Sequence, residues 1–374
     1  MSPNNLKLNT IEEAIHEIRE GKVLIVVDNE DRENEGDFVC AAECITPSII
    51  NFMATHGKGL ICAPIDERRA DELDLPLMVS ANTAFHETAF TVSIDLIGHG
   101  CTTGISAHDR ATCIKALTDP GSKASDFARP GHIFPLRAKS GGVLRRNGHT
   151  EAAVDLARMA GLYPAGVLVE ILNQDGSMAR LPELLEIARL HQLKIITIQD
   201  LVSYRLRHER LIERSFEKEI HTPLGDFRVL IYRQSNGDEH LAIVKGFFDG
   251  EEAVPVRVHS SSESGDIYSV LFEGYAHQIE KTMEFIHKEG KGVFLNLFHG
   301  EKKRPLSESI RNHGQPKSLA VEENEQQRDI GVGAQILKDL GIRKIRLITS
   351  QPKRRIGLKA FDLEIVGHLD PNLL

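Results

Sequence analysis

Cysteine and long apolar runs are both scarce in this chain, and each shortage excludes a class of protein. Only five of the 374 residues are cysteine, with irregular spacing and no CxxC pair. An odd, scattered set of this kind fits reduced thiols rather than a disulfide framework. The longest purely aliphatic run, Val23 to Val27, is far too short to span a membrane. Glu12, Glu13 and Glu17 precede any apolar run, which argues against a secretory signal, so we expect a cytoplasmic protein that makes no membrane contact.

Positive charge is also in short supply. The 45 lysines and arginines are outnumbered by 54 aspartates and glutamates, which gives a formal net charge of -9. That balance argues against general nucleic-acid binding. The apolar fraction of 41% and the charged fraction of 26% are those of ordinary globular domains, and the length suits two of them.

Helical and strand patterns alternate along the whole chain, so we predict an α/β (α+β layered) protein. The charged stretch 205–219 has almost no apolar pattern and is interpreted as a helical linker, which gives domains at 1–207 and 208–374. After it we expect a hairpin whose turn is Thr222 to Gly225. The polar stretch 300–327 is expected to be mobile. Predicted helices cover 10–20, 46–56, 150–160, 181–191, 275–288 and 333–340; predicted strands cover 23–27, 59–63, 89–95, 166–172, 194–198, 227–232, 254–258, 292–297 and 344–349.

An acidic loop follows the first predicted strand, in the segment VVDNEDRENEGD. Six carboxylates repel one another in so short a loop, and a hard cation among them would relieve that repulsion. Arg32 in the middle offers a planar fork for a phosphate or a carboxylate. The alternative is a solvated acidic turn with no ligand.

A second loop, in KSGGVLRRNGHTEAAVDLARMAG, leads into the helix that begins near Thr150. Its glycines permit close backbone approach, and Arg146 precedes the free N–H groups of the helix, so the segment could cradle an anion. His149 is placed to act as a metal ligand or as an acid or base. The alternative is a common glycine turn with a surface imidazole.

Two polar side chains occur in segments that are otherwise apolar or are made rigid by proline. His132 lies between two prolines in RPGHIFPLRA, and Glu170 lies within the apolar strand GVLVEI. A carboxylate in such a strand is costly unless it is paired or functional. A structural salt bridge would explain Glu170 equally well.

Taken together and in this order, these segments resemble the 3,4-dihydroxy-2-butanone 4-phosphate synthase family. The matching stretches are DNEDRENEGD, TTGISAHDRAT, DFARPGHIFPLRAKSGGVLRRNGHTEAAVDLARMAGLYPAGVLVEI and DGSMAR, and they cover about residues 11–208. The resemblance implies a lyase that converts ribulose 5-phosphate to 3,4-dihydroxy-2-butanone 4-phosphate and formate in riboflavin biosynthesis.

The same resemblance assigns roles to individual residues. Glu33 and His149 match the ligands of Mg²⁺ or Mn²⁺, with two ions expected per site, and His132 and Glu170 match the catalytic positions. His108 departs from the family, where a smaller residue is usual. The family also implies a homodimer with sites near the subunit interface. Positions that match the substrate-binding residues are Arg32, Glu33, Asp37, Cys62, Thr112, Arg146, Asn147, Gly148, His149, Thr150 and Glu170; Ser106, Asp109 and Arg110 match others that line the pocket.

The chemistry of that reaction fits these residue types. Ribulose 5-phosphate must lose a proton beside its carbonyl, dehydrate, rearrange its carbon skeleton and release one carbon as formate. Developing oxyanions are stabilised by a divalent metal, and proton transfers need a carboxylate and an imidazole.

From about residue 227 onward the chain resembles GTP cyclohydrolase II, in VPVRVHSSSESGDIY and RDIGVGAQILKDLGIRKIRLITSQPKRRIGLKAFDLEIV. The family's three zinc-binding cysteines are replaced here by Ser262, Glu273 and Tyr275, and no cysteine follows Cys113. Because a catalytic zinc needs three protein ligands, His259 and Glu273 fall short. The family's EGRG segment is replaced around FHGEKKR, and an acidic residue reads as Gln326, with Arg328 retained. We therefore predict no zinc and no turnover in this domain.

Three hypotheses follow. The favoured one is a synthase fused to a degenerate partner domain. The alternative is a bifunctional enzyme that also has GTP cyclohydrolase II activity. The third is a binding or regulatory protein without activity, which would require gaps in the first site.

Overall fold

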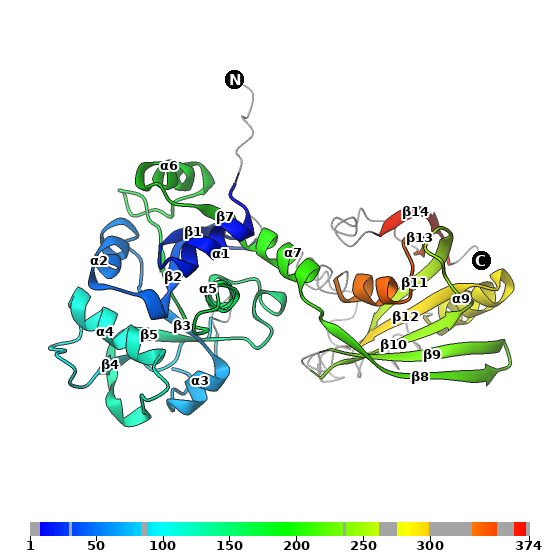
Figure 1. The fold of residues 1–374 in the computed structure, drawn as a ribbon, viewed down its shortest axis with the longest axis horizontal. Helices are drawn as coiled ribbons and strands as arrows, with labels where there is room; N and C mark the ends of the chain where they lie inside the picture. Colours follow the sequence, from blue (N-terminus) through cyan, green and yellow to red (C-terminus); the bar gives the residue numbers. More distant parts are fainter. Residues whose placement is uncertain are drawn as a thin grey trace, which may run out of the picture. The chain divides into compact units, whose positions relative to one another are not determined.

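The computed structural model describes residues 8–29, 32–83, 88–234, 237–261, 275–298, 331–349 and 363–371. The chain divides into two compact units, Met1–Arg205 and Leu206–Leu374 (Figure 1). Each unit is a mixed α/β domain with one seven-stranded sheet, which confirms the predicted fold class. No helix in the described part of the chain is both long and apolar enough to cross a membrane.

The first unit holds a mixed sheet with strand order β4-β5-β3-β6-β2-β1-β7. Its central strands pair antiparallel, as in β2 with β6, whereas β3 with β5 and β1 with β7 are parallel. The strands are β1 (Leu24–Val27), β2 (Gly36–Ala41), β3 (Cys62–Asp66), β4 (Ile94–Leu96), β5 (Phe127–Ala138), β6 (Gly166–Glu170) and β7 (Ile195–Thr197).

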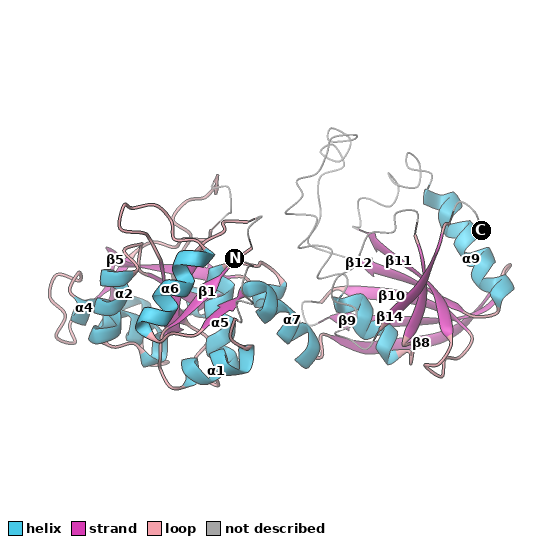
Figure 2. Ribbon diagram, turned by 90° about the horizontal axis from the view of Figure 1, so that it is seen from above, coloured by secondary structure: helices cyan, strands magenta, loops and turns pink. Residues whose placement is uncertain are grey.

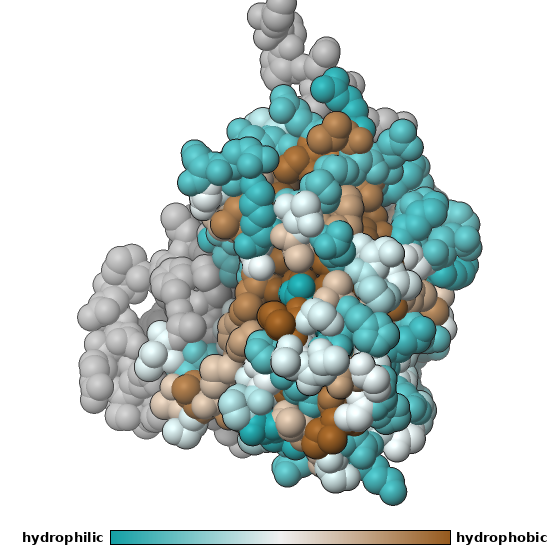
Figure 3. All heavy atoms as spheres, turned by 90° about the vertical axis from the view of Figure 1, so that its left-hand side faces the viewer, coloured by the Kyte–Doolittle hydropathy of each residue, from teal (hydrophilic) through white to brown (hydrophobic). Residues whose placement is uncertain are grey.

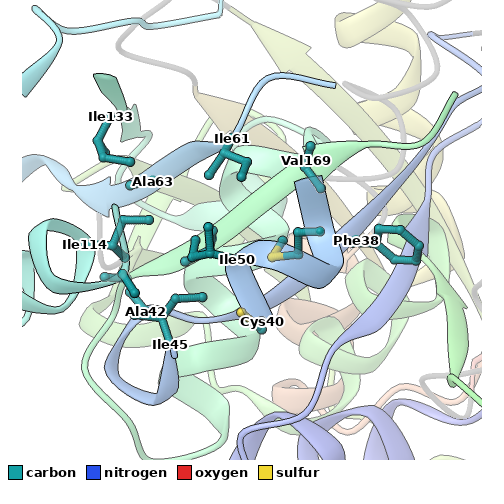
Figure 4. Packing of buried hydrophobic residues seen from close by; sticks show 14 of the residues in the cluster. Phe38, Cys40, Ala42, Ile45, Ile50, Ile61, Ala63, Ile114, Ile133 and Val169 are labelled. Atoms are coloured by element: carbon teal, nitrogen blue, oxygen red, sulfur yellow. The ribbon is translucent and has the colours of Figure 1, made fainter. Parts of the chain in front are cut away.

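Helices cover both faces of this sheet (Figures 1 and 2), because its central strands are apolar on both sides. One face packs against α2 (Pro47–His56), α4 (Ala107–Leu117) and α6 (Leu181–His191). There Phe38, Cys40, Ile50 and Val169 belong to one buried cluster (Figure 4). The other face packs against α5 (His149–Met159), which also contacts α1 (Ile11–Arg19). A short α3 (Glu67–Glu72) follows β3, and α7 (Ile198–His208) follows β7.

The helix ends agree with the sequence signals. Thr10 caps α1 in a capping box with Glu13, and Thr46 caps α2, which has proline in its first turn. Strand β3 begins at Cys62, later than the predicted strand 59–63. The physical reason is that the amides of Gly59 and Leu60 are bonded to Glu170.

The second unit has strand order β14-β13-β11-β12-β10-β9-β8. Helix α9 (Tyr275–Glu289) packs on the sheet through Ile279, Met283 and Ile286, against Phe227 and Phe294. Residues 331–339 are also helical. The strands are β8 (Ile212–Thr222), β9 (Gly225–Gln234), β10 (Glu239–Lys245), β11 (Ala253–Ser261), β12 (Gly292–Phe298), β13 (Lys344–Ile348) and β14 (Glu364–Leu369).

The predicted helical linker at 205–219 is wrong over most of its length. Helix α7 ends at His208, and Ile212 begins the edge strand β8, most of which is exposed. Because both faces of this strand meet water, it lacks the alternation that marks a half-buried strand. Cross-strand pairs such as Arg228 with Glu217, at 3.1 Å, stabilise it instead. The predicted turn is correct, since Thr222 pairs with Gly225. The stretch 300–327 lies outside the described residues.

Candidate active site

The acidic loop between β1 and β2 is held by two residues that bond to its backbone. The buried Asp28 carboxylate accepts the amides of Glu33 (3.2 Å) and Glu35 (2.9 Å) and a hydrogen bond from Arg32 (2.7 Å). Arg180 donates hydrogen bonds to the backbone carbonyl oxygens of Glu33, at 2.9 Å, and of Asn34. With its amides and carbonyls both fixed, the loop aims the Glu33 side chain in one direction.

The Glu33 carboxylate points toward the imidazole of His149 at the start of α5. His149 Nδ1 lies 3.7 Å from Glu33 Oε2 and 4.0 Å from Asp37 Oδ2, and its Nε2 is 3.2 Å from the carbonyl of Val26. Possible ligand atoms of Asp28, Glu33 and His149 all lie within 4.8 Å of one another. Both Asp28 oxygens accept backbone amides of the loop, whereas the Glu33 carboxylate contacts the side chains of Arg32, at 2.7 Å, and His149. Glu33 and His149 are therefore the better candidates for ligands.

The charges in this cluster shift one another's pKa values. Burial opposes protonation of His149, but the Asp37 and Glu33 carboxylates outweigh it and raise the His149 pKa to about 9. Burial acts against ionisation of Glu33, yet its hydrogen bond to His149 and the charge of Arg32 lower the Glu33 pKa to about 2. Burial raises the pKa of Asp37 to about 7, although His149 acts in the opposite direction. A carboxylate and imidazole set of this kind fits a hard divalent cation, which would replace the imidazolium proton.

Glu170 joins the cluster through the pairing of β2 with β6, which sets it opposite Asp37. Its Oε2 accepts the amide of Leu60 at 2.8 Å, and its backbone carbonyl accepts the amide of Gly59 at 3.2 Å. Cys62 belongs to the same neighbourhood: burial, with Glu170 and Asp37, holds the pKa of its thiol well above the usual range. Asp37, Cys62 and Glu170 thus lie near one another at the α5 side of the sheet.

The loop before α5 brings a cationic side chain to a helix N-terminus. Arg146 Nη1 lies 2.7 Å from the buried Glu151 carboxylate, which also accepts the amide of Lys139 at 3.1 Å. Gly148 caps the helix, and a methyl group there would lie 2.2 Å from Arg146 Nη1. Thr150 is buried in the first turn. An arginine beside the N-terminus of a helix is an arrangement that can bind an anion.

His132 belongs to a different hydrogen-bonded pair. Its Nδ1 lies 2.7 Å from Asp95 Oδ2, and its backbone amide donates to Asp95 Oδ1 at 2.9 Å. Within the described residues, both of these hydrogen bonds run to Asp95 rather than to Glu33, His149 or Glu170. The side chain is 45% exposed.

The residues on and just before α4 that were predicted to line the pocket make hydrogen bonds within the helix and the loop before it. Ser106 caps it, and Thr112 donates to the carbonyl of His108 at 2.8 Å. Asp109 accepts from Thr102 (2.8 Å) and from the amide of Gly104 (3.0 Å). In the described part of the chain, these hydrogen bonds stay on α4 and the loop before it.

Sequence reasoning singled out neither Arg180, Asp95 nor Glu151. Arg180 reaches a residue 147 positions away, and Asp95 one that is 37 positions away. The only sequence signal for Arg180 was its place in the DGSMAR motif. Glu151 gave none, because an acidic residue in the first turn of a helix is common.

In the second unit, His259 of β11 pairs with Asn296 of β12. Burial, with the charge of Arg257, lowers the His259 pKa to about 4. Ser262, Glu273, Gln326 and Arg328, and the side chain of Tyr275, lie outside the described residues. In the described part of this unit, no three possible ligands gather as they do around His149.

A group of carboxylates and one imidazole beside a helix N-terminus, on a mixed α/β sheet, is typical of an enzyme of the α/β class that uses a divalent metal. The 3,4-dihydroxy-2-butanone 4-phosphate synthase family matches residues 12–204, and the GTP cyclohydrolase II family matches residues 213–370. The chain is 55% identical over 370 residues to riboflavin biosynthesis protein RibBA of Cytophaga hutchinsonii, covering 96% of this chain and 91% of the relative. It is 50% identical over 381 residues to RibBA of Aquifex aeolicus, covering 98% and 94%.

Two solved structures are similar as well. RibBX of A. baumannii, described as a two-domain 3,4-dihydroxy-2-butanone 4-phosphate synthase, matches with TM-score 0.78 and 40% identity over 97% of this chain and 99% of that one. A 3,4-dihydroxy-2-butanone 4-phosphate synthase in complex with two magnesium ions matches with TM-score 0.52 and 42% identity, over 54% of this chain and 98% of that one.

The chain therefore belongs to the 3,4-dihydroxy-2-butanone 4-phosphate synthase family, and it carries a GTP cyclohydrolase II domain after the synthase domain. It is a 3,4-dihydroxy-2-butanone 4-phosphate synthase, an enzyme of riboflavin biosynthesis.

Proposed function

We propose that residues 1–207 form one active site in which Glu33 and His149 hold Mg²⁺ or Mn²⁺, two ions per site, and Glu170 and His132 transfer protons. The observation that carries this proposal is the cluster of the half-buried Glu33 with the buried Asp37 and His149, with Glu170 across the strand pair. The donor atoms suit either cation, since both accept oxygen ligands together with an imidazole.

Within this site, Arg146 and the first turn of α5, with Thr150, would bind the phosphate of ribulose 5-phosphate. The phosphate does not react, so its binding positions the sugar for the steps at the other end. Arg32, whose guanidinium is held by Asp28 and Glu33 at 2.7 Å each, is fixed beside the metal ligands and can bind a substrate oxygen. Asn147, Gly148, Cys62 and Thr112 complete the proposed substrate-binding set.

The bound metal supplies Lewis acidity toward substrate oxygens. Glu170 would accept the proton beside the substrate carbonyl, because its carboxylate is oriented by the Leu60 amide and the residue lies opposite Asp37 across the strand pair. His132 would handle a second proton. One molecule of water is lost before the carbon skeleton migrates, and one is taken up when formate is released, so the two products together contain all the atoms of ribulose 5-phosphate.

We also propose that the protein works as a homodimer. The first unit leaves large apolar side chains exposed, including Leu77, Met78, Val79, Ile97 and Ile105, each between 47% and 55% exposed. Figure 3 shows apolar residues reaching the surface at several places on the face that it draws. Exposed apolar area of this kind supports a subunit interface.

The synthase proposal is tested by assaying formate from ribulose 5-phosphate with the full chain. We expect activity with Mg²⁺ that excess EDTA abolishes. Glu33→Ala and His149→Ala should each require far more Mg²⁺ for half-maximal activity, because each removes a ligand. Activity that excess EDTA does not reduce would contradict the metal-dependent part, and no activity with any divalent metal would contradict the assignment.

For the second domain, residues 208–374, the comparisons favour the bifunctional alternative. The GTP cyclohydrolase II family matches nearly all of it, and relatives named RibBA match the whole chain. One observation opposes that alternative: no cysteine occurs after Cys113, so this domain offers zinc no thiolate ligand. The similar two-domain structure RibBX is described by its synthase activity.

On the strength of the missing cysteines we propose that this domain does not turn over GTP and that it stabilises the synthase domain, bridges subunits or binds a regulatory nucleotide. Metal analysis of the full chain carrying Glu33→Ala and His149→Ala, which removes the ligands proposed for the first site, tests the first part. We expect substoichiometric zinc after dialysis against zinc-containing buffer. One zinc ion per chain that survives dialysis would contradict the proposal and would support the bifunctional alternative.

A further inference from the structure

The segment Arg129 to His132 is looped out of the β4–β5 ladder. Ile94 pairs with Ile133, but the next residue, Asp95, pairs with Ala128. Ile94 and Asp95 are adjacent in β4, but their partners in β5 are five positions apart. The four residues between those partners, Arg129 to His132, therefore have no partner in the ladder. A bulge of this size re-aims the side chains it carries.

Backbone amides of this bulge donate hydrogen bonds to side chains on β4 and just before it. The amide of Gly131 donates to Ser93 Oγ at 3.1 Å, and the amide of His132 donates to Asp95 Oδ1 at 2.9 Å. Gly131 packs so closely on β4 that a methyl group there would lie 2.0 Å from the carbonyl carbon of Ile94. The backbone of His132 is therefore held by the same strand that holds its ring.

The Asp95 carboxylate is itself confined. A methyl group on Gly104 would lie 2.2 Å from its Oδ2, so the backbone of residue 104 closes one side of it. The amide of Gly104 is in turn held by Asp109 at 3.0 Å. Asp95 Oδ1 accepts the backbone amide of His132, and Asp95 Oδ2 lies 2.7 Å from His132 Nδ1. One carboxylate thus contacts both the backbone and the ring of the same residue.

We infer that Asp95 is a positioning residue for His132. A carboxylate accepts but does not donate, so it selects the form of the ring that carries hydrogen on Nδ1 and leaves Nε2 free to exchange a proton. This arrangement resembles that of other carboxylate-oriented histidine bases. The inference rests on the proposed role of His132 and extends it to a residue that touches no substrate.

Asp95→Asn is the sharpest test, because it keeps the shape beside Gly104 and can still accept the His132 amide. Its NH₂ group would face Nδ1, so the ring would turn to the other tautomer. For the full chain we expect kcat for formate release to fall by at least ~10-fold, within the range of general acid–base effects, with KM unchanged. Asp126→Asn, which changes a carboxylate just before β5 that bonds Lys123, is the matched control and should keep wild-type kcat.

Two further measurements separate positioning from loss of structure and from failure of the proposed function. In a His132→Gln background, Asp95→Asn should cause no additional loss of kcat, because its effect passes through the ring. Nitrogen-15 NMR of histidine-labelled protein, with the His132 signals assigned by their absence in His132→Gln, should show hydrogen on Nδ1 and should show the reverse in Asp95→Asn.

The outcomes are distinct. If His132→Gln keeps wild-type kcat, both the role of His132 and this inference are wrong. If His132→Gln loses turnover while Asp95→Asn keeps it, or if the two losses multiply, only the inference about Asp95 is wrong. An Nε2–H ring in the unaltered protein would overturn the inference independently of any activity.

Discussion

Carboxylates in the first domain divide between those that accept hydrogen bonds from the backbone and those that lie beside the His149 imidazole. Asp28 and Glu151 accept hydrogen bonds from backbone amides and arginines, whereas Glu33 and Asp37 lie at 3.7 and 4.0 Å from the His149 imidazole. Sequence motifs singled out Glu33 and His149 because both occur in long ordered segments. The family resemblance chose Glu33 over Asp28, but the residue types alone could not, since both are acidic residues of one loop and only the folded backbone shows that Asp28 accepts its amides.

Glu170→Gln tests the proposed base. Glutamine keeps the volume and can still accept the Leu60 amide, but it cannot take a proton. We expect kcat to fall by ~10²- to 10⁴-fold with Mg²⁺ affinity and KM nearly unchanged. The exposed Glu12→Gln on α1 serves as the control. Turnover of Glu170→Gln near the wild-type rate would show that another group is the base.

Metal binding should depend on pH through His149. Its pKa is raised to about 9 in the metal-free protein, so at pH 7 the imidazole is protonated and must lose a proton to bind the cation. Apparent Mg²⁺ affinity should therefore rise up to ~10-fold per pH unit as pH increases toward 9, and then level off. Isothermal titration calorimetry in buffers of different ionisation enthalpy measures both affinity and proton release. Binding without proton release at pH 7 would contradict this assignment.

At the scale of elements, strand pairing and tight turns build the site. The β2–β6 register sets Asp37 opposite Glu170, and the turn after α2 supplies the amides that hold Glu170. Periodicity and capping signals predicted α1, α2 and α6 closely, because amphipathic helices carry their own pattern. The edge strand β8 was missed because a strand exposed on both faces has no apolar alternation.

Gly59→Ala tests the turn that holds Glu170. A methyl group there would lie 2.4 Å from Glu170 Oε2 and 2.8 Å from its backbone oxygen, so the strand end must move. We expect a marked fall in kcat and a lower melting temperature, with overpacking costing about 1–3 kcal/mol. Gly121→Ala is the control in a surface turn, because its methyl group would lie nearest to a flexible Asp119 carboxylate, at 3.2 Å. Wild-type kcat in Gly59→Ala would show that this turn does not position the base.

At the scale of the whole molecule, the two domains each have one seven-stranded sheet but differ in the polar and metal-binding residue types that they contain. The first gathers carboxylates, an imidazole and an arginine around one loop and one helix end. The second keeps its seven-stranded sheet and its family match but contains no cysteine. The fold class was predictable because it follows from alternating elements and family motifs. The contacts that align the site, such as Arg180 with the acidic loop, were not, because they join residues far apart in sequence.

Both reactions at issue release formate, so one assay on the full chain compares them directly. The protein is given ribulose 5-phosphate with Mg²⁺, or GTP with Mg²⁺ and Zn²⁺, and formate is measured in each. We predict rapid formate release from ribulose 5-phosphate, abolished by EDTA, and none above background from GTP. Zinc-dependent formate release from GTP, or none from ribulose 5-phosphate, would contradict the assignment of one active domain joined to one that does not turn over.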